Sequence, residues 1–311
     1  MSVEMREQLE VTVPASIANL GPGFDTLAVA VQLYLRLKVK VVNGRDKLDF
    51  QFVRNPLKGE NYIQRAFRFL ARQHGGSHAS LAVEVHSEIP MRSGLGSSAA
   101  ATVAGLRLYE ALYGPLPSQA LLNAACTLEG HPDNAAAALF GGLTASCQLP
   151  DGSAYAAQFH WPEQLQFVVL TPDVALATSE SRRVLPTMVP RSDAVFNLQR
   201  MALLLQLLQS GNFSLLRQAL SDRLHQPFRQ ALVPGLEQAL HLEHESVLGV
   251  CLSGAGPSIV AFAERDHEVV AKLLASCVEK SGIDFEVRTL KVHQADGESV
   301  AADYDPCTVC V

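Results

Sequence analysis

A glycine- and serine-rich stretch at residues 90–101 constrains this chain more than any other part of its sequence. Before it, residues 81–85 alternate apolar with smaller or polar side chains, a pattern that predicts a strand. After it, Val103, Leu106 and Leu112 recur at helical spacing in an alanine-rich segment. The stretch is therefore predicted to be a strand-to-helix turn, and it contains no acidic side chain.

The residue types in this turn suit an anion. Gly94 and Gly96 can adopt positive φ and allow a ligand to approach the backbone closely. Ser97 and Ser98 are natural helix caps, and the first turn of the following helix offers unpaired N–H groups and the positive end of its dipole. This chemistry favours an anion site, most simply for the phosphates of a nucleotide. The alternative interpretation is a tight turn that uses glycine only for its geometry.

The turn does not follow the common P-loop pattern, because that pattern requires Gly-Lys and the chain contains no Gly-Lys pair. Its sequence, Pro90-Met-Arg-Ser-Gly-Leu-Gly-Ser-Ser-Ala, instead resembles the phosphate-binding motif of the GHMP kinases, a family of small-molecule kinases. The resemblance implies ATP as the phosphoryl donor, and it places Asn61, in an earlier loop, near the adenine. The ATP contacts that it implies in the turn are Pro90, Met91, Arg92, Ser93, Gly94, Leu95, Gly96, Ser97, Ser98, Ala99 and Ala100.

A second motif follows a predicted strand at residues 9–13. A sharp Gly-Pro-Gly bend at 21–23 has Asn19 on one side and Asp25 on the other, and both could be ordinary turn residues. Residues 13–25 nevertheless resemble the homoserine kinase version of the first GHMP motif. The resemblance implies that Asn19 and Asp25 face an amino-acid substrate, and an anionic Asp25 would suit an α-ammonium group.

A third motif, Glu129-Gly-His-Pro-Asp-Asn134, ends a predicted helix at 118–129. Its Gly and Pro are ordinary helix stop signals, so one interpretation of the string is purely structural. Clustered carboxylate and amide oxygens also suit Mg²⁺. The resemblance implies that Glu129 and Ser98 bind Mg²⁺ and that Asn134 contacts the substrate. His131 is expected to be structural, because no second His or Cys lies at metal-ligand spacing.

The pattern of the sequence changes near Trp161, and this change predicts domains at 1–162 and 163–295 and a flexible tail at 296–311. Strands at 246–252 and 258–263, the helix that Asp266 is expected to cap, and a strand at 285–292 are typical of half a ferredoxin-like sandwich. Helices are also expected at 179–185, 192–209, 213–220 and 232–241.

Three further substrate contacts are implied by homoserine kinase-like segments of this half. Arg182 and Arg229 would bind a carboxylate, where the planar guanidinium is favoured over Lys. Arg183 is the competing residue for the first position, and sequence spacing does not choose between the two. Gly254 lies in Ser-Gly-Ala-Gly-Pro-Ser, which resembles the third GHMP motif, whose glycines let the turn sit against the phosphate loop.

Bulk properties narrow the class of protein. The net charge of −6 and the pI of about 5.9 argue against a nucleic-acid-binding protein. No apolar run approaches the roughly 18 residues of a membrane span, and the polar N-terminus lacks a signal-peptide core, so we expect a cytoplasmic protein without a membrane partner. Cys307 and Cys310 are expected to be incidental thiols of the tail.

The motifs appear in the family's order over about residues 11–292. The resemblance implies an α+β fold of two domains, with an N-terminal domain like domain 2 of ribosomal protein S5 and a C-terminal ferredoxin-like domain, in a homodimer. It implies transfer of the γ-phosphoryl of Mg·ATP to the side-chain hydroxyl of L-homoserine in threonine biosynthesis. The implied catalytic residues are Asn134, Asp25 and Glu129, and Asp25 could be a base or only a substrate ligand. A kinase for a different alcohol and a non-catalytic nucleotide-binding regulator are the alternatives.

Overall fold

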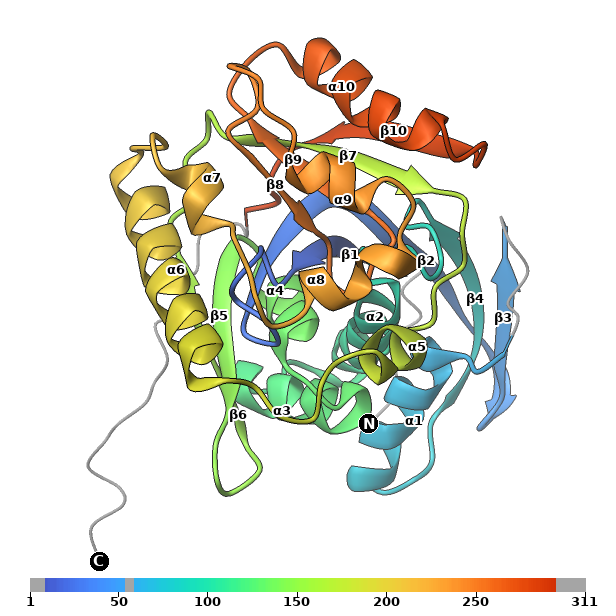
Figure 1. Cartoon of the computed structure of the whole chain (residues 1–311). Helices are drawn as coiled ribbons and strands as arrows, with labels where there is room; N and C mark the ends of the chain where they lie inside the picture. Colours follow the sequence, from blue (N-terminus) through green and yellow to red (C-terminus); the bar gives the residue numbers. More distant parts are fainter. Residues whose placement is uncertain (1–8, 54–58, 295–311) are drawn as a thin grey trace, which may run out of the picture.

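The structure is a computed structural model, and it describes residues 9–53 and 59–294 (Figure 1). Its strands are β1 (Leu9–Ala18), β2 (Leu27–Arg45), β3 (Leu48–Phe52), β4 (Ala79–Ser87), β5 (Leu143–Gln148), β6 (Ala154–Phe159), β7 (Gln166–Pro172), β8 (Gly249–Leu252), β9 (Ile259–Ala263) and β10 (Phe285–Leu290). Its α-helices are α1 (Tyr62–Gln73), α2 (Ser97–Tyr113), α3 (Ser118–Glu129), α4 (Asp133–Phe140), α5 (Thr178–Arg183), α6 (Arg191–Ser210), α7 (Leu216–Ala219), α8 (Gln226–Arg229), α9 (Leu236–Leu240) and α10 (His267–Glu279). A 3₁₀ turn, η1 (Gln230–Leu232), follows α8.

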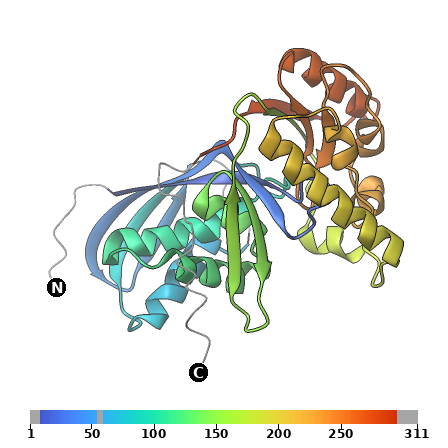
Figure 2. The ribbon, with the colours of Figure 1, turned by 90° about the vertical axis from the view of Figure 1, so that its left-hand side faces the viewer.

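The larger sheet is built around β2. Its strand order is β3-β4-β2-β5-β6, β1 pairs with β2, and β3–β4 is the parallel pair, joined through α1. Leu33, Leu35 and Leu37 of β2 are buried while Lys38 and Lys40 are exposed, as expected for a strand with one face on the core. Figure 2 shows helices α1–α4 gathered on one face of this sheet. The N-terminal half of the chain therefore presents α2 and the loop before it against β1.

The smaller sheet is antiparallel, with strand order β10-β7-β9-β8. Alternate residues of β7 face opposite sides: Val168 and Leu170 join the core under α9 and α10, whereas Phe167 and Val169 join the larger core with Trp161. The boundary expected near residue 162 falls between β6, which closes the larger sheet, and β7, which opens the smaller one. The tail expected at 296–311, with Cys307 and Cys310, lies outside the described residues.

Several local predictions need correction. Strands β3 and β6 were not predicted, because both are short and half-buried and lack clear alternation. The helices expected at 213–220 and 232–241 shrink to the single turns α7 and α9. Asp266 does not cap α10 through its side chain: it has a φ of 55° and accepts a hydrogen bond from Ser246 instead.

Candidate active site

The phosphate loop, which we define as residues 93–99, consists of the end of the turn that follows β4 and the first residues of α2, so the predicted strand-to-helix turn is confirmed. Gly94 and Gly96 have φ values of 81° and 69°, the left-handed region that glycine tolerates without strain. The prediction that Ser97 and Ser98 cap α2 is wrong, because Gly96 is the N-cap and no side chain caps this helix. The first N–H groups of a 17-residue helix therefore keep no side-chain acceptor, which suits an anion.

The C-terminal half clamps the phosphate loop from one side. Ser253 Oγ donates to Gly94 O at 2.7 Å, and Ser258 N donates to Ser93 O at 3.0 Å. A Cβ at Gly94 would lie 2.4 Å from Ser253 O and 2.8 Å from Gly256 O, so only glycine fits there. The turn at 253–258 thus lies against the phosphate loop, as the resemblance implied.

Glu129 lies at the end of α3 beside the phosphate loop. Its carboxylate accepts hydrogen bonds from Ser98 Oγ at 2.5 Å and Thr102 Oγ1 at 2.5 Å, and Arg65 Nη2 lies 3.6 Å away. The carboxylate is almost buried, with 7% of its side chain exposed. An anionic oxygen and two hydroxyls, next to a loop suited to phosphate, match the hard oxygen ligands that Mg²⁺ prefers.

Asn134 lies beside Gly96, where an added Cβ would come within 3.0 Å of its Oδ1. Its Oδ1 accepts a hydrogen bond from Ser16 Oγ at 2.8 Å, and its Nδ2 donates to Asp133 Oδ1 at 3.2 Å. Asp133 also accepts a 2.6 Å hydrogen bond from His131 Nδ1, which raises the pKa of His131. The structure thus links Asn134 to the first motif through the buried Ser16.

Asn19 and Gly254 tie the first motif to the turn at 253–258. Asn19 Nδ2 donates to Gly254 O at 3.0 Å, and Asn19 Oδ1 accepts from Asp25 N at 3.1 Å. Asn19 is buried, and its side-chain oxygen and nitrogen both have protein partners. Its observed role is to hold Asp25, so the direct substrate contact predicted for Asn19, like that of Gly254, stays a prediction.

Asp25 and Arg182 form a bidentate ion pair. Arg182 Nη1 and Nη2 donate to the two Asp25 oxygens at 2.9 and 2.7 Å, while the neighbouring Arg183 is exposed. The pair is half-exposed, and the hydrogen bond to Asp25 raises the pKa of Arg182. The prediction that Asp25 and an arginine of α5 share one site is therefore consistent with the geometry, and the arginine that points to Asp25 is Arg182.

Arg229 is buried next to this pair. Its Nε donates to Ser181 O at 3.2 Å and its Nη1 donates to Gly254 O at 2.9 Å. Burial lowers its pKa to about 10, and the nearby Arg182 adds to that effect. Arg229 Nη1 also lies 3.2 Å from His225 Nδ1. A buried guanidinium without a carboxylate partner among the described residues suits an anionic ligand group.

Comparison with known proteins identifies the family. Residues 61–142 match the GHMP kinases N terminal domain, and residues 204–280 match GHMP kinases C terminal. A homoserine kinase from Deinococcus radiodurans is 41% identical over 291 residues, covering 92% of this chain and 94% of that protein. One from Solibacter usitatus is 39% identical over 279 residues, covering 87% and 90%. The chain belongs to the homoserine kinase family of GHMP kinases.

The fold agrees with this membership. A crystal structure of homoserine kinase from Cytophaga hutchinsonii superposes with a TM-score of 0.83 at 25% identity, covering 94% of this chain and 98% of that one. The predicted two-domain α+β fold of the GHMP kinases is therefore confirmed.

Asn61, the ATP contact implied before α1, has a different visible role. It is the N-cap of α1, and its Oδ1 accepts from Gln64 N at 3.0 Å. The helix that it caps carries Arg65, which contacts Glu129. A contact between Asn61 and the adenine of ATP stays a prediction.

Sequence reasoning missed four residues that the structure brings to the site. Thr102 lies four residues after Ser98 on the same face of α2, and that spacing was a usable signal. Ser16 and Phe24 lie inside the first motif but carry no local sign of what they contact. His225 had no signal, because its partners come from residues far away in the chain.

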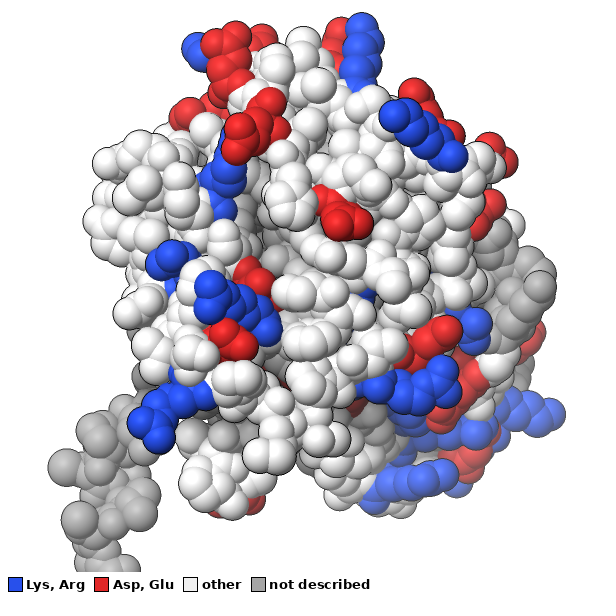
Figure 3. Space-filling view, viewed as in Figure 1, with Lys and Arg blue, Asp and Glu red and all other residues white. Residues whose placement is uncertain are grey.

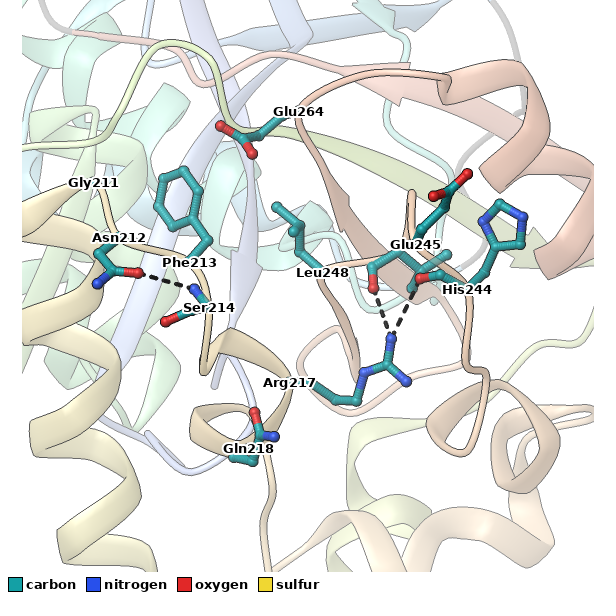
Figure 4. A pocket seen from close by; sticks show the side chains of 11 residues that line it. Gly211, Asn212, Phe213, Ser214, Arg217, Gln218, His244, Glu245, Leu248 and Glu264 are labelled. Atoms are coloured by element: carbon teal, nitrogen blue, oxygen red, sulfur yellow. Dashed lines mark hydrogen bonds between the residues drawn. The ribbon is translucent and has the colours of Figure 1, made fainter.

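The described residues line two further cavities. One of about 350 Å³ lies beside the start of the phosphate loop, where Ser93 and the three residues before it face Asp173 and Phe285 across the cavity. Another of about 570 Å³ lies between α7 and the loop before β8, where Arg217 Nη2 donates to the carbonyls of His244 and Val247 (Figure 4).

The surface carries mixed charge where it is displayed. On the face shown in Figure 3, basic and acidic side chains are interspersed and separated by uncharged surface. Among the described residues, no helix is long and apolar enough to cross a membrane.

Proposed function

We propose that this chain is an ATP-dependent kinase that phosphorylates the side-chain hydroxyl of L-homoserine to give O-phospho-L-homoserine, a step towards threonine. The observation that carries the proposal is the meeting of two different sites. A backbone site for phosphate at residues 93–99 adjoins an acid–base pair, Asp25 and Arg182, backed by the buried cation of Arg229. A phosphoryl donor and an amino acid would thus be held next to each other.

The phosphate side would bind Mg·ATP. The first N–H groups of α2 and the glycines of the loop accommodate phosphate oxygens without the Lys of a P-loop. Glu129 and Ser98 would hold Mg²⁺, which neutralises charge on the phosphate oxygens when it is bound. Thr102 and Arg65 hold the Glu129 carboxylate in place through the contacts described above.

The amino-acid side matches a zwitterion. In the structure Asp25 and Arg182 neutralise one another. A bound α-amino acid would give each of them a new partner: the α-ammonium for Asp25, and the α-carboxylate for Arg182 and Arg229. Asp25 and Arg182 would each exchange one oppositely charged partner for another. Binding a zwitterion therefore costs less electrostatic free energy than binding a singly charged ligand, which would leave one of the two without a partner.

The transfer step needs positioning more than proton abstraction. Phosphoryl transfer proceeds through a loose transition state, so alignment and charge neutralisation dominate. Asn134 lies between the phosphate loop and the His131–Asp133 pair, and a Cβ at Gly96 would come within 3.0 Å of Asn134 Oδ1. We assign Asn134 to orient the acceptor hydroxyl and Asp25 to bind the ammonium group.

A coupled assay of ADP release tests the proposal. Homoserine, threonine, shikimate and mevalonate would be compared at equal concentration with Mg·ATP. We expect turnover with homoserine far above that with the other three. Preference for shikimate or mevalonate would establish a GHMP kinase for another alcohol, and ATP binding without turnover of any acceptor would establish a non-catalytic regulator.

A further inference from the structure

We propose that Phe24 and His225 form a platform that positions the guanidinium groups of Arg182 and Arg229 for the substrate carboxylate. The inference rests on the proposed function, because it assigns those two arginines to that carboxylate. In the part of the chain that the structure describes, neither Phe24 nor His225 has a hydrogen bond or a ring contact with residues 93–99. Both are therefore positioning residues rather than catalytic ones.

The Phe24 ring contacts His225, Arg182 and Arg229. It stacks on the His225 ring with centroids 5.1 Å apart and planes 22° apart. The Cζ atoms of Arg229 and Arg182 lie 5.4 and 5.6 Å from the centroid of the same ring. A cation within about 6 Å of an aromatic centroid is attracted by the ring quadrupole. One phenyl ring thus stabilises two like charges that would otherwise repel one another.

Two arginines beside one another need such support, because only one has a carboxylate partner. Asp25 receives both of its guanidinium hydrogen bonds from Arg182. Arg229 donates hydrogen bonds from Nε to Ser181 O and from Nη1 to Gly254 O and His225 Nδ1. Among the described residues its Nη2 has no hydrogen bond, so Nη2 is the donor left for a carboxylate. The orientation of the other two nitrogens decides where Nη2 points.

His225 fixes that orientation through its tautomer. Its Nε2 lies 2.8 Å from Gly21 O, a carbonyl that can only accept, so Nε2 carries the hydrogen. Nδ1 is then an acceptor and receives the hydrogen bond of Arg229 Nη1 at 3.2 Å. Asp222 holds the backbone of this turn by accepting from the N–H groups of His225 and Gln226. The ring is therefore fixed at both nitrogens and on one face.

Two isosteric substitutions separate the two ends of the His225 ring. His225→Gln keeps a donor near Gly21 O and removes the acceptor at the Nδ1 position. His225→Asn keeps an acceptor at the Nδ1 position and removes the donor to Gly21. If the ring acts through Arg229, His225→Gln raises the KM for homoserine by about tenfold, as for a lost charged hydrogen bond, with the KM for ATP nearly unchanged. His225→Asn raises it by less than about threefold.

A second pair of variants tests the ring of Phe24. Phe24→Leu removes the aromatic face and keeps an apolar side chain of similar size, and it should raise the KM for homoserine by about fivefold. Phe196 is the matched control, because Arg223 and Arg200 lie 4.1 and 4.5 Å from its centroid. Phe196→Leu loses the same kind of contact outside the carboxylate site, so its KM for homoserine should equal that of the wild type.

The outcomes distinguish this inference from the proposed function. A wild-type enzyme that does not phosphorylate homoserine overturns the proposed function, and the platform with it. An active wild type whose His225→Asn variant is impaired more than His225→Gln overturns the platform, because His225 would then act through Gly21. Equal losses in both KM values, with lowered melting temperatures in all variants including Phe196→Leu, would show a purely structural role.

Discussion

The phosphate loop and the amino-acid site, which we define as Asn19, Asp25, Arg182, His225 and Arg229, are adjacent but built in opposite ways. The phosphate loop is one continuous segment that offers glycine backbone and a helix N-terminus to a ligand. The amino-acid site takes charged or polar side chains from three separate parts of the chain. The first depends on the absence of side chains, and the second depends on their mutual orientation.

This difference predicts different failures. A substitution in the phosphate loop meets backbone atoms that cannot move, so it should damage the fold and the ATP site together. A substitution in the amino-acid site breaks one partnership among several, so it should alter homoserine binding and leave ATP binding intact. The predictions below test that division, beginning with the largest expected effect.

Gly94→Ala should destabilise the protein by about 3 kcal/mol or more. The new Cβ would lie 2.4 Å from Ser253 O at a φ of 81°, so both clash and strain contribute. Gly152 is the matched control, with a φ of 85° and nothing within 4 Å of its added Cβ. Gly152→Ala carries the strain alone and should cost about 1 kcal/mol. Urea unfolding measures both, and equal costs would show that the phosphate loop is not clamped.

Glu129→Gln should lower kcat by about a hundredfold and move the Mg²⁺ dependence to higher concentration, because a charged ligand for a hard cation is lost. Glu110 serves as the control, since its side chain is also mostly buried, with 11% exposed, and accepts hydrogen bonds from Arg107 and Leu116 N. Glu110→Gln should leave the Mg²⁺ titration unchanged. If the Mg²⁺ titration of Glu129→Gln matched that of the wild type, the metal ligand would be another residue, and Asp133 would be tested next.

The same difference explains how much could be predicted from the sequence. The strand, turn and helix around the phosphate loop could be predicted because their signal is local: glycines, serines and the apolar patterns on either side. Its capping could not be predicted, because Ser98 turns to Glu129 from another helix. Arg182 and Arg183 were indistinguishable in sequence, and only the packing of α5 aims Arg182 at Asp25. His225 could not be found at all, since its role arises from contacts with Gly21, Phe24 and Arg229.

Arg182→Ala should weaken homoserine use by about 2 kcal/mol in kcat/KM, near the lower end for a lost partner of a charge pair. The pair with Asp25 is half-exposed, with 38% and 34% of the two side chains accessible, so water offsets part of the loss. Arg182→Lys should rescue only part of the activity, because Lys keeps the positive charge but cannot form the bidentate contact. Arg183→Ala is the neighbouring control and should change nothing. Comparable losses for homoserine and ATP would instead mean that Arg182 binds phosphate.

The smallest expected effect is a pH dependence of stability that originates at His225. Burial lowers the pKa of this side chain below its ordinary value of 6.5, opposed by the charge of Asp222 and assisted by that of Arg229. Below its ordinary pKa the unfolded chain binds a proton that the folded chain refuses. The free energy of unfolding therefore decreases as the pH falls, and His225 contributes at most about 1.4 kcal/mol per pH unit to that decrease. His225→Asn should flatten this fall in urea unfolding between about pH 7 and pH 5.

His131 provides the opposite sign in the same protein. Its hydrogen bond to Asp133 raises its pKa, so its contribution to stability is complete below its ordinary pKa of 6.5 and is lost as the pH rises through the raised value. His131→Asn should therefore make stability rise more steeply with pH, whereas His225→Asn makes it rise less steeply. If His225→Asn left the slope unchanged or made it steeper, the neutral His225 required by the amino-acid site would be wrong. Its Nδ1 could then not accept the hydrogen bond of Arg229.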